Sequence, residues 1–153
     1  MSTASRLLTI VFLMSAFAAP LFAQNNPSFA NGDIDTGTST IHFSARQHDS
    51  DPVDGQIVVN GAVSVTVAVD CFAIFGNRAA MSGTIVASSQ PSLVGQHSLL
   101  AVEDNGQGAK SPPDRYTFVL ISADDCHTFP LSTAPLQDVT GGHVHVKASS
   151  APF

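Results

Sequence analysis

Alternation of apolar and polar residues with a period of two is the feature that most constrains the fold of this chain. It recurs almost everywhere after residue 23, whereas the 3.6-residue period of amphipathic helices is nearly absent. In the clearest segment, one face of the expected strand carries a run of alternate apolar residues: Val63, Val65, Val67, Val69 and Cys71. Side chains on a strand point alternately to its two faces, so this pattern predicts strands with one buried face. We therefore expect an all-β protein.

Turn signals divide the alternating segments into short strands. Asn60-Gly61 separates two apolar runs and is the strongest hairpin signal, because both residues tolerate a positive φ angle. The expected strands cover residues 28–30, 40–46, 55–60, 62–72, 79–88, 97–104, 114–122 and 142–147, with a loop or short helical turn from Thr128 to Gly141. About eight short antiparallel strands in succession predict a meander that forms a closed or nearly closed barrel. A two-sheet β-sandwich is the alternative, and the alternation is compatible with both.

The first 23 residues have the organisation of a signal peptide. Arg6 is their only charge, and it precedes an apolar run from Leu7 to Phe22 that is too short for a comfortable membrane span. We expect cleavage near Ala23. Residues 24–38 are rich in Asn, Ser, Thr and Gly, and we expect most of them to form a flexible lead-in to a single β domain over residues 39–153. The mature protein is expected to be secreted or periplasmic, and not an integral membrane protein.

The charge balance argues against one class of partner. Only 12% of the residues are charged, against about 25% in a typical soluble domain. Acidic residues outnumber basic ones by 12 to 6, which gives a formal net charge of −6. A nucleic-acid-binding protein needs a basic face that displaces counterions from phosphates. We therefore expect no nucleic-acid partner.

The chain has two cysteines, Cys71 and Cys126. In an oxidising compartment an even number of cysteines suggests a disulfide. The alternative is a pair of buried free thiols. We expect a disulfide between Cys71 and Cys126, which would close a long loop and stabilise the domain by about 4 kcal/mol.

Several short strings, taken in their order and spacing, resemble a widespread family of secreted bacterial all-β domains of unknown function. They are Val69–Cys71 (VDC), Gly76–Ala79 (GNRA), Ser82–Ile85 (SGTI), Asp104–Gly108 (DNGQG), Pro112–Asp114 (PPD) and Gly141–Val146 (GGHVHV). Together they span most of residues 41–147. The chain departs from the family in having Gln107 where Glu is frequent and His143 where Asn is frequent, which weakens an ion-binding role carried over from the family. The resemblance implies an exported β domain and leaves the activity open.

The turn at residues 104–108 is a candidate calcium site. Its candidate ligands are Glu103, Asp104, Asn105 and Asp114, which lie near one glycine-rich loop. Calcium takes about six to eight oxygen ligands from carboxylates, amides and carbonyls. The alternative is an ordinary hairpin loop, in which Asn and Gly provide positive φ angles and the Asp side chains hydrogen-bond the backbone.

Two histidines, His143 and His145, form a second candidate metal site, for zinc or copper. They flank Val144, so alternation places both imidazoles on one face of a strand. A metal site needs further ligands, and the other histidines of the chain are His42, His48, His97 and His127. The alternative is a solvent-facing strand whose valines pack in the core.

No motif indicates an enzyme. The chain has no Gly-x-Ser-x-Gly elbow, no His-Glu-x-x-His sequence, no P-loop and no dinucleotide-binding fingerprint. A small barrel can hold one small molecule, but a domain of this size needs most of its apolar side chains for its own core. We expect an exported, non-catalytic structural or interaction module of unknown specific role and without a cofactor. Its partner is left open, with surface proteins, polysaccharide and self-assembly as the candidates. The alternative is an extracytoplasmic binding protein with a small-molecule site or a site for Ca, Zn or Cu.

Overall fold

The computed structural model describes residues 26–149 of the 153-residue chain. The expected signal peptide over residues 1–23 and its cleavage site lie outside the described residues. Between residues 26 and 149 the only helix is the three-residue 3-10 helix η1 (Pro91–Leu93), and no helix there is long and apolar enough to cross a membrane. This part of the chain is therefore built almost wholly from strands and turns.

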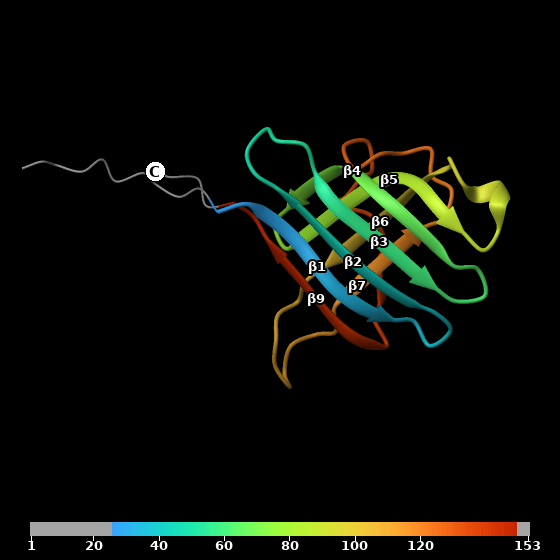
Figure 1. The fold of residues 1–153 in the computed structure, drawn as a ribbon. Coiled ribbons are helices and arrows are strands. Elements are labelled where there is room, and N and C mark those ends of the chain that lie inside the picture. The colour runs from blue at the N-terminus through green and yellow to red at the C-terminus, as the bar shows by residue number, and fades with distance from the viewer. Residues whose placement is uncertain (1–25, 150–153) are drawn as a thin grey trace, which may run out of the picture.

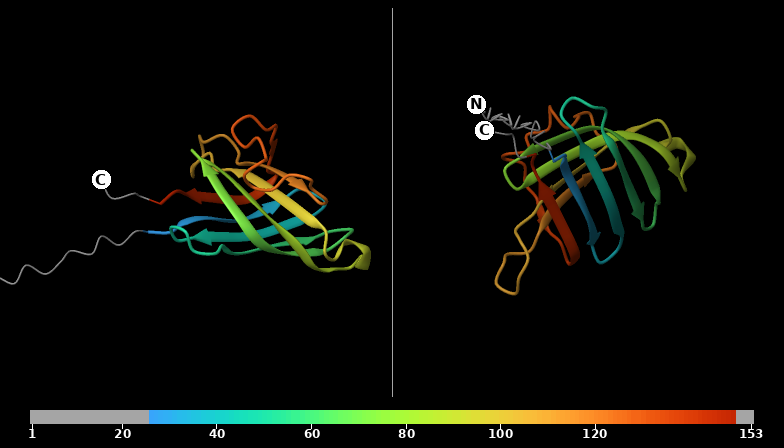
Figure 2. Two further views of the ribbon diagram at one scale, coloured as in Figure 1. Left: turned by 90° about the horizontal axis from the view of Figure 1, so that it is seen from above. Right: turned by 60° about the vertical axis from the view of Figure 1, so that its left-hand side comes forward.

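Nine antiparallel strands form one sheet within residues 26–149. They are β1 (Ser28–Asp35), β2 (Thr40–Gln47), β3 (Asp54–Asn60), β4 (Val65–Phe75), β5 (Arg78–Ser88), β6 (His97–Glu103), β7 (Arg115–Val119), β8 (Gln137–Asp138) and β9 (Gly141–Lys147). Each strand from β1 to β7 pairs with the next, and β9 returns to pair with β1 on its other side. The sheet curls strongly on itself (Figures 1 and 2), which confirms the expected meander and nearly closed barrel rather than a two-sheet sandwich.

The interior of the barrel is packed with apolar side chains. Alternate residues of the strands face inward, and those with almost no exposed surface include Ile34, Ile41, Ile57, Val67, Met81, Ile85, Leu100, Val102 and Val144. Burial of such side chains is the dominant favourable term in folding. Within residues 26–149 no buried side-chain nitrogen or oxygen lacks a hydrogen-bond partner. The inside of the curled sheet is thus a hydrophobic core.

A second apolar cluster lies on the outside of the sheet, over β5 and β6. The strands contribute Ala80, Leu99 and Ala101, and the segment between β7 and β8 contributes Cys126, Leu131, Ala134 and Leu136. As a result, the residues of β6 after His97 are buried on both faces of the strand. The chain therefore covers its own barrel wall over β5 and β6, whereas the outward side chains of β9, β1, β2 and β3 are mostly exposed.

The prediction of a flexible lead-in over residues 24–38 is wrong for the part that forms β1. This strand lies between β2 and β9 and pairs with both. Its inward residues are Ala30, Gly32 and Ile34. A Cβ atom on Gly32 would lie 2.2 Å from the carbonyl oxygen of His143 and 2.9 Å from the ring of Phe43, so glycine lets β9 and this ring approach closely. The small inward residues Ala30 and Gly32, together with polar outward residues, made β1 resemble a flexible segment.

The expected placement of Cys71 on the inward face with the valines is also wrong. A register shift between Val69 and Cys71 in the pairing of β4 with β5 marks a β-bulge. Val69 and, beyond the bulge, Phe72 belong to the inner core, whereas Cys71 packs in the outer cluster. The extra residue reverses the alternation, and Cys71 consequently faces the segment that carries Cys126.

Candidate functional site

The outward side chains of β9, β1, β2 and β3 form a surface that we call the polar face. It consists of the exposed residues Asn31, Asp33, His42, Ser44, Gln56, His143 and His145. Cross-strand pairing arranges them in two adjacent rows. The first row is His143, Asp33 and His42, and the second row is His145, Asn31, Ser44 and Gln56. Antiparallel pairing alone thus brings together residues that are more than 100 positions apart in the sequence.

In the first row Asp33 stands between two histidines. Oδ1 of its carboxylate contacts Nδ1 of His42, and Oδ2 lies 4.0 Å from Nδ1 of His143. The three side chains are 53–55% exposed. Asp33 was missed at the sequence level because it fell in the presumed lead-in. Had the alternation of residues 28–35 been recognised as a strand, Asp33 would have been placed on its outward face.

His145 has a different neighbour. Its ring packs edge-on against the ring of Phe29 on β1, with centroids 5.1 Å apart and an interplanar angle of 88°. His143 and His145 therefore share the exposed face of β9, but their rings engage different partners. The structure groups His143 with Asp33 and His42 rather than with His145.

Two adjoining depressions hollow the polar face. The first has a volume of about 310 Å³, and its lining includes Asp33, His42, Gln56 and His143. The second has a volume of about 440 Å³ and reaches Phe29. Asn31 and Ser44 line both depressions. The two depressions therefore adjoin at Asn31 and Ser44, in the second row of polar side chains.

Three of the candidate calcium residues, Asp104, Asn105 and Asp114, lie in the loop between β6 and β7, which runs beside β9 (Figures 1 and 2). β8 and β9 are at opposite ends of the strand order, so strand pairing leaves the barrel open between them. Oδ2 of Asp114 accepts a hydrogen bond from the backbone N–H of Val144 at 2.8 Å, and Oδ2 of Asp104 accepts one from Val146 at 3.0 Å. The two carboxylates thus accept hydrogen bonds from the free edge of β9 and hold this edge against the loop between β6 and β7.

Other oxygen atoms of this loop also accept hydrogen bonds. Oδ1 of Asp114 accepts one from the N–H of Asn105 at 2.8 Å, and Oδ1 of Asp104 accepts one from the N–H of Gly106 at 2.9 Å. The side-chain oxygen of Asn105 accepts a bond of 3.3 Å from the amide of Asn77. The structure therefore brings three of the candidate ligands together, but N–H groups point at the oxygens that calcium would need. A bound calcium ion would have to displace donors that hold β9 in place.

Glu103, the fourth candidate calcium ligand, is directed elsewhere. It is buried, and its Oε2 accepts a hydrogen bond of 2.5 Å from Nε of Arg78 on β5. Nη1 of Arg78 also donates to the carbonyl oxygens of Leu131, Ser132 and Ala134 at 3.1–3.4 Å. This ion pair fastens the segment between β7 and β8 (residues 120–136), which we call the outer segment, to β5 and β6.

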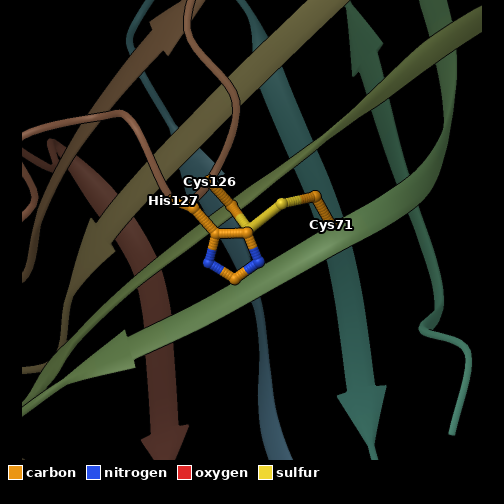
Figure 3. A group of neighbouring side chains, drawn as sticks. All are labelled: Cys71, Cys126 and His127. Carbon is orange, nitrogen blue, oxygen red and sulfur yellow. A yellow bond between two sulfur atoms is a disulfide. The ribbon is translucent and has the colours of Figure 1, made fainter. Parts of the chain in front are cut away.

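The predicted disulfide between Cys71 and Cys126 is present, with Cα atoms 5.6 Å apart. His127 lies beside it (Figure 3), and these three residues form a group whose nitrogen and sulfur atoms lie within 4.8 Å of one another. A metal ion binds the thiolate form of cysteine. Because the two sulfur atoms are bonded to each other, the group acts as a covalent staple between β4 and the outer segment.

A local turn positions Cys126 for this bond. Oδ1 of Asp125 accepts hydrogen bonds from the N–H groups of Thr128 at 2.9 Å and His127 at 2.8 Å. Both hydrogen bonds favour the charged carboxylate and therefore lower the pKa of Asp125 below its usual value. The bond from Thr128 has the largest effect. The N–H of Cys126 donates to the hydroxyl of Ser82 on β5 at 3.1 Å. The turn and this hydrogen bond hold Cys126 against the outside of the sheet.

Comparisons of this chain with protein-family models, with curated proteins and with solved structures found no match.

Proposed function

We propose that this protein is an exported, non-catalytic binding module that contacts an extracellular polysaccharide through the polar face. The observation that carries the proposal is the unequal covering of the barrel wall. The outer segment and its disulfide cover β5 and β6, whereas the outside of β9, β1, β2 and β3 is exposed and hollowed. An exposed and hollowed sheet surface is open to a partner.

The chemistry of the polar face favours a polar polymer over a protein. Protein interfaces are centred on aromatic and other large anchors that become buried on binding. The polar face instead presents amides, a hydroxyl, imidazoles and a carboxylate, and within residues 26–149 the amides of Asn31 and Gln56 have no hydrogen-bond partner. Such groups match the hydroxyls of a sugar chain. Phe29, which is half-buried in the second depression, adds an aromatic edge against which a sugar ring can pack.

The arrangement around His42 supports binding rather than acyl transfer. The contact of His42 with Asp33 is the orienting half of a Ser-His-Asp triad. The complete triad also requires a serine hydroxyl hydrogen-bonded to the histidine. No serine within the described part of the chain forms that bond with His42. Within residues 26–149 the pair is therefore a contact on the polar face without a hydrogen-bonded serine, and we assign it to binding.

The disulfide between Cys71 and Cys126 supports export. Disulfides persist in oxidising compartments and are rare in the reducing cytoplasm. We expect the full chain, expressed in a bacterium that exports proteins, to accumulate outside the cytoplasm with Gln24 as its first residue. N-terminal sequencing of the purified product tests this, and a cytoplasmic product that retains residues 1–23 would contradict it.

The binding test uses the disulfide-bonded protein and a panel of cell-surface polysaccharides. We expect at least one polysaccharide to bind, and we expect Asn31→Ala and Gln56→Ala each to weaken the binding at least fivefold because each removes an amide donor and acceptor. Gln107→Ala is the matched control, since Gln107 is exposed in the loop between β6 and β7, outside the polar face. Binding that Gln107→Ala weakens as much as Gln56→Ala, or a panel without any bound polysaccharide, would refute the proposal.

A further inference from the structure

Three residues with metal-binding side chains occupy one row of the sheet. His143 on β9 is the register partner of Asp33 on β1, and Asp33 is the register partner of His42 on β2. Directly paired residues on antiparallel strands have Cβ atoms about 5 Å apart and project from the same face. The backbone thus places two imidazoles on either side of one carboxylate.

The side chains turn toward one another within this row. The carboxylate of Asp33 directs Oδ1 at Nδ1 of His42 and Oδ2 at Nδ1 of His143, the latter at 4.0 Å. His145 is a contrast on the same strand, because its ring packs against Phe29 instead. The approach of both rings to Asp33 therefore belongs to the row, and it is not a general property of the exposed histidines.

We propose that Asp33, His42 and His143 bind a divalent transition-metal ion of the kind that prefers imidazole, with Zn²⁺ or Cu²⁺ as the ion. Two imidazoles and one carboxylate suit zinc and copper, whereas calcium and magnesium take oxygen ligands. Ligand atoms bind zinc at about 2.0–2.2 Å. In the structure the ligand atoms of Asp33, His42 and His143 are not all within 4.8 Å of one another, and Asp33 already contacts His42. Metal binding therefore requires the carboxylate to release this contact and the two rings to move closer, and the three side chains are exposed enough to make this adjustment.

The surroundings of the row are compatible with a bound cation. The three residues line the depression of about 310 Å³, which is open to solvent and leaves a coordination position for water or for a partner atom. The chain carries a formal net charge of −6, so its overall field attracts cations. This inference goes beyond the proposed polysaccharide binding, which does not require a metal ion.

Calorimetric titration of ZnCl₂ into the chelator-treated protein, prepared without a polyhistidine tag, tests the site. We expect one ion per chain, with affinity at least tenfold weaker in each of Asp33→Asn, His42→Ala and His143→Ala. His145→Ala is the matched control and should change the affinity less than twofold. A copper titration followed by electron paramagnetic resonance should show two coordinated nitrogens in the unmodified protein and one in His143→Ala.

The possible results separate the two proposals. Absence of zinc binding, or equal loss of affinity in His145→Ala and His143→Ala, would overturn the metal site and leave an ordinary cross-strand His–Asp–His row. Thermal unfolding of each variant without metal checks that it is folded, and zinc should raise the Tm of the unmodified protein but not that of His143→Ala. Polysaccharide binding is measured with and without chelator. A loss of polysaccharide binding in Gln56→Ala can then be distinguished from an effect of zinc.

Discussion

The hydrogen bonds of two carboxylates to the free edge of β9 lead to a specific prediction for Asp114→Ala. This substitution removes the acceptor of the Val144 N–H on the free edge of β9 and the acceptor of the Asn105 N–H in the loop. Val144 is fully buried, so water does not readily replace the lost partner of its N–H group. Asp104→Ala removes the equivalent acceptor for Val146.

The magnitude follows from the two hydrogen bonds of Asp114. A hydrogen bond to a charged group contributes about 1.5–3 kcal/mol, and a buried donor left without a partner costs about 1–3 kcal/mol. Asp114 is half-buried, so solvent screens part of this effect. We expect a loss of about 2–3 kcal/mol in the free energy of unfolding. For a domain of this size, that corresponds to a fall in Tm of about 10 °C.

The assay combines thermal unfolding with amide hydrogen exchange. Asp124→Ala is the matched control, because Asp124 is exposed and, among residues 26–149, only its backbone groups form hydrogen bonds. It should change stability by less than about 0.5 kcal/mol. In Asp114→Ala the amide of Val144 should exchange faster, while amides in the centre of β5 keep their protection. A Tm for Asp114→Ala within 2 °C of the control, or unchanged protection of Val144, would refute the role assigned to these carboxylates.

Three further perturbations test the remaining structural conclusions. Reduction of the bond between Cys71 and Cys126 should lower the free energy of unfolding by about 4 kcal/mol, measured as a lower urea midpoint with reductant; an unchanged midpoint would contradict this. Gly32→Ala should destabilise the protein by about 2 kcal/mol or more, because the new Cβ atom would lie 2.2 Å from a backbone carbonyl oxygen. Gly141→Ala is the control for the same urea titration. It should have a small effect, because the nearest atom to its new Cβ lies at 3.4 Å. The lowered pKa of Asp125 stabilises the folded state above the usual pKa of 3.8, and this contribution is lost as the pH falls through the folded-state pKa. The stability difference between the unmodified protein and Asp125→Asn should therefore be present at pH 6 and shrink below about pH 4, and a pH-independent difference would contradict the assignment.

Local patterning was sufficient to locate most of the strands. β2, β3, β5, β6 and β9 lie within one or two residues of the segments expected from alternation and turn signals. The length of β1 was underestimated because one of its inward residues is Gly32. A glycine is needed there because a Cβ atom would collide with the ring of Phe43. Alternation cannot report such a requirement, since it arises from a neighbouring strand.

The bulge in β4 shows a second limit of local patterning. One extra residue between Val69 and Cys71 reverses the direction of every later side chain in the strand. The regular spacing of valines before it gives no sign of the reversal. The pairing of Cys71 with Cys126 was nevertheless predictable, because a disulfide between the only two cysteines needs no knowledge of which face they occupy.

The candidate sites were only partly accessible from the sequence. The acidic loop was recognised as a cluster of oxygen ligands, but the structure directs Asp104 and Asp114 at backbone N–H groups of β9. His143 was identified as a potential ligand, yet Asp33 and His42 joined it only through pairing of β1 with both neighbours. Side chains that are distant in sequence become neighbours through strand order, which residue types alone do not specify.

The sequence by itself determined the all-β class, most strand positions, the single possible disulfide and the sparse charge of the chain. These properties depend on residue type and on periodicity along a strand, which are local. Only the tertiary structure decided that the meander curls into one nearly closed barrel, that β9 pairs with β1, and that one side of the wall is covered while the polar face stays exposed. Those outcomes depend on sheet curvature, on a bulge and on contacts between distant segments. The contacts stabilise the folded state only when the whole sheet has formed.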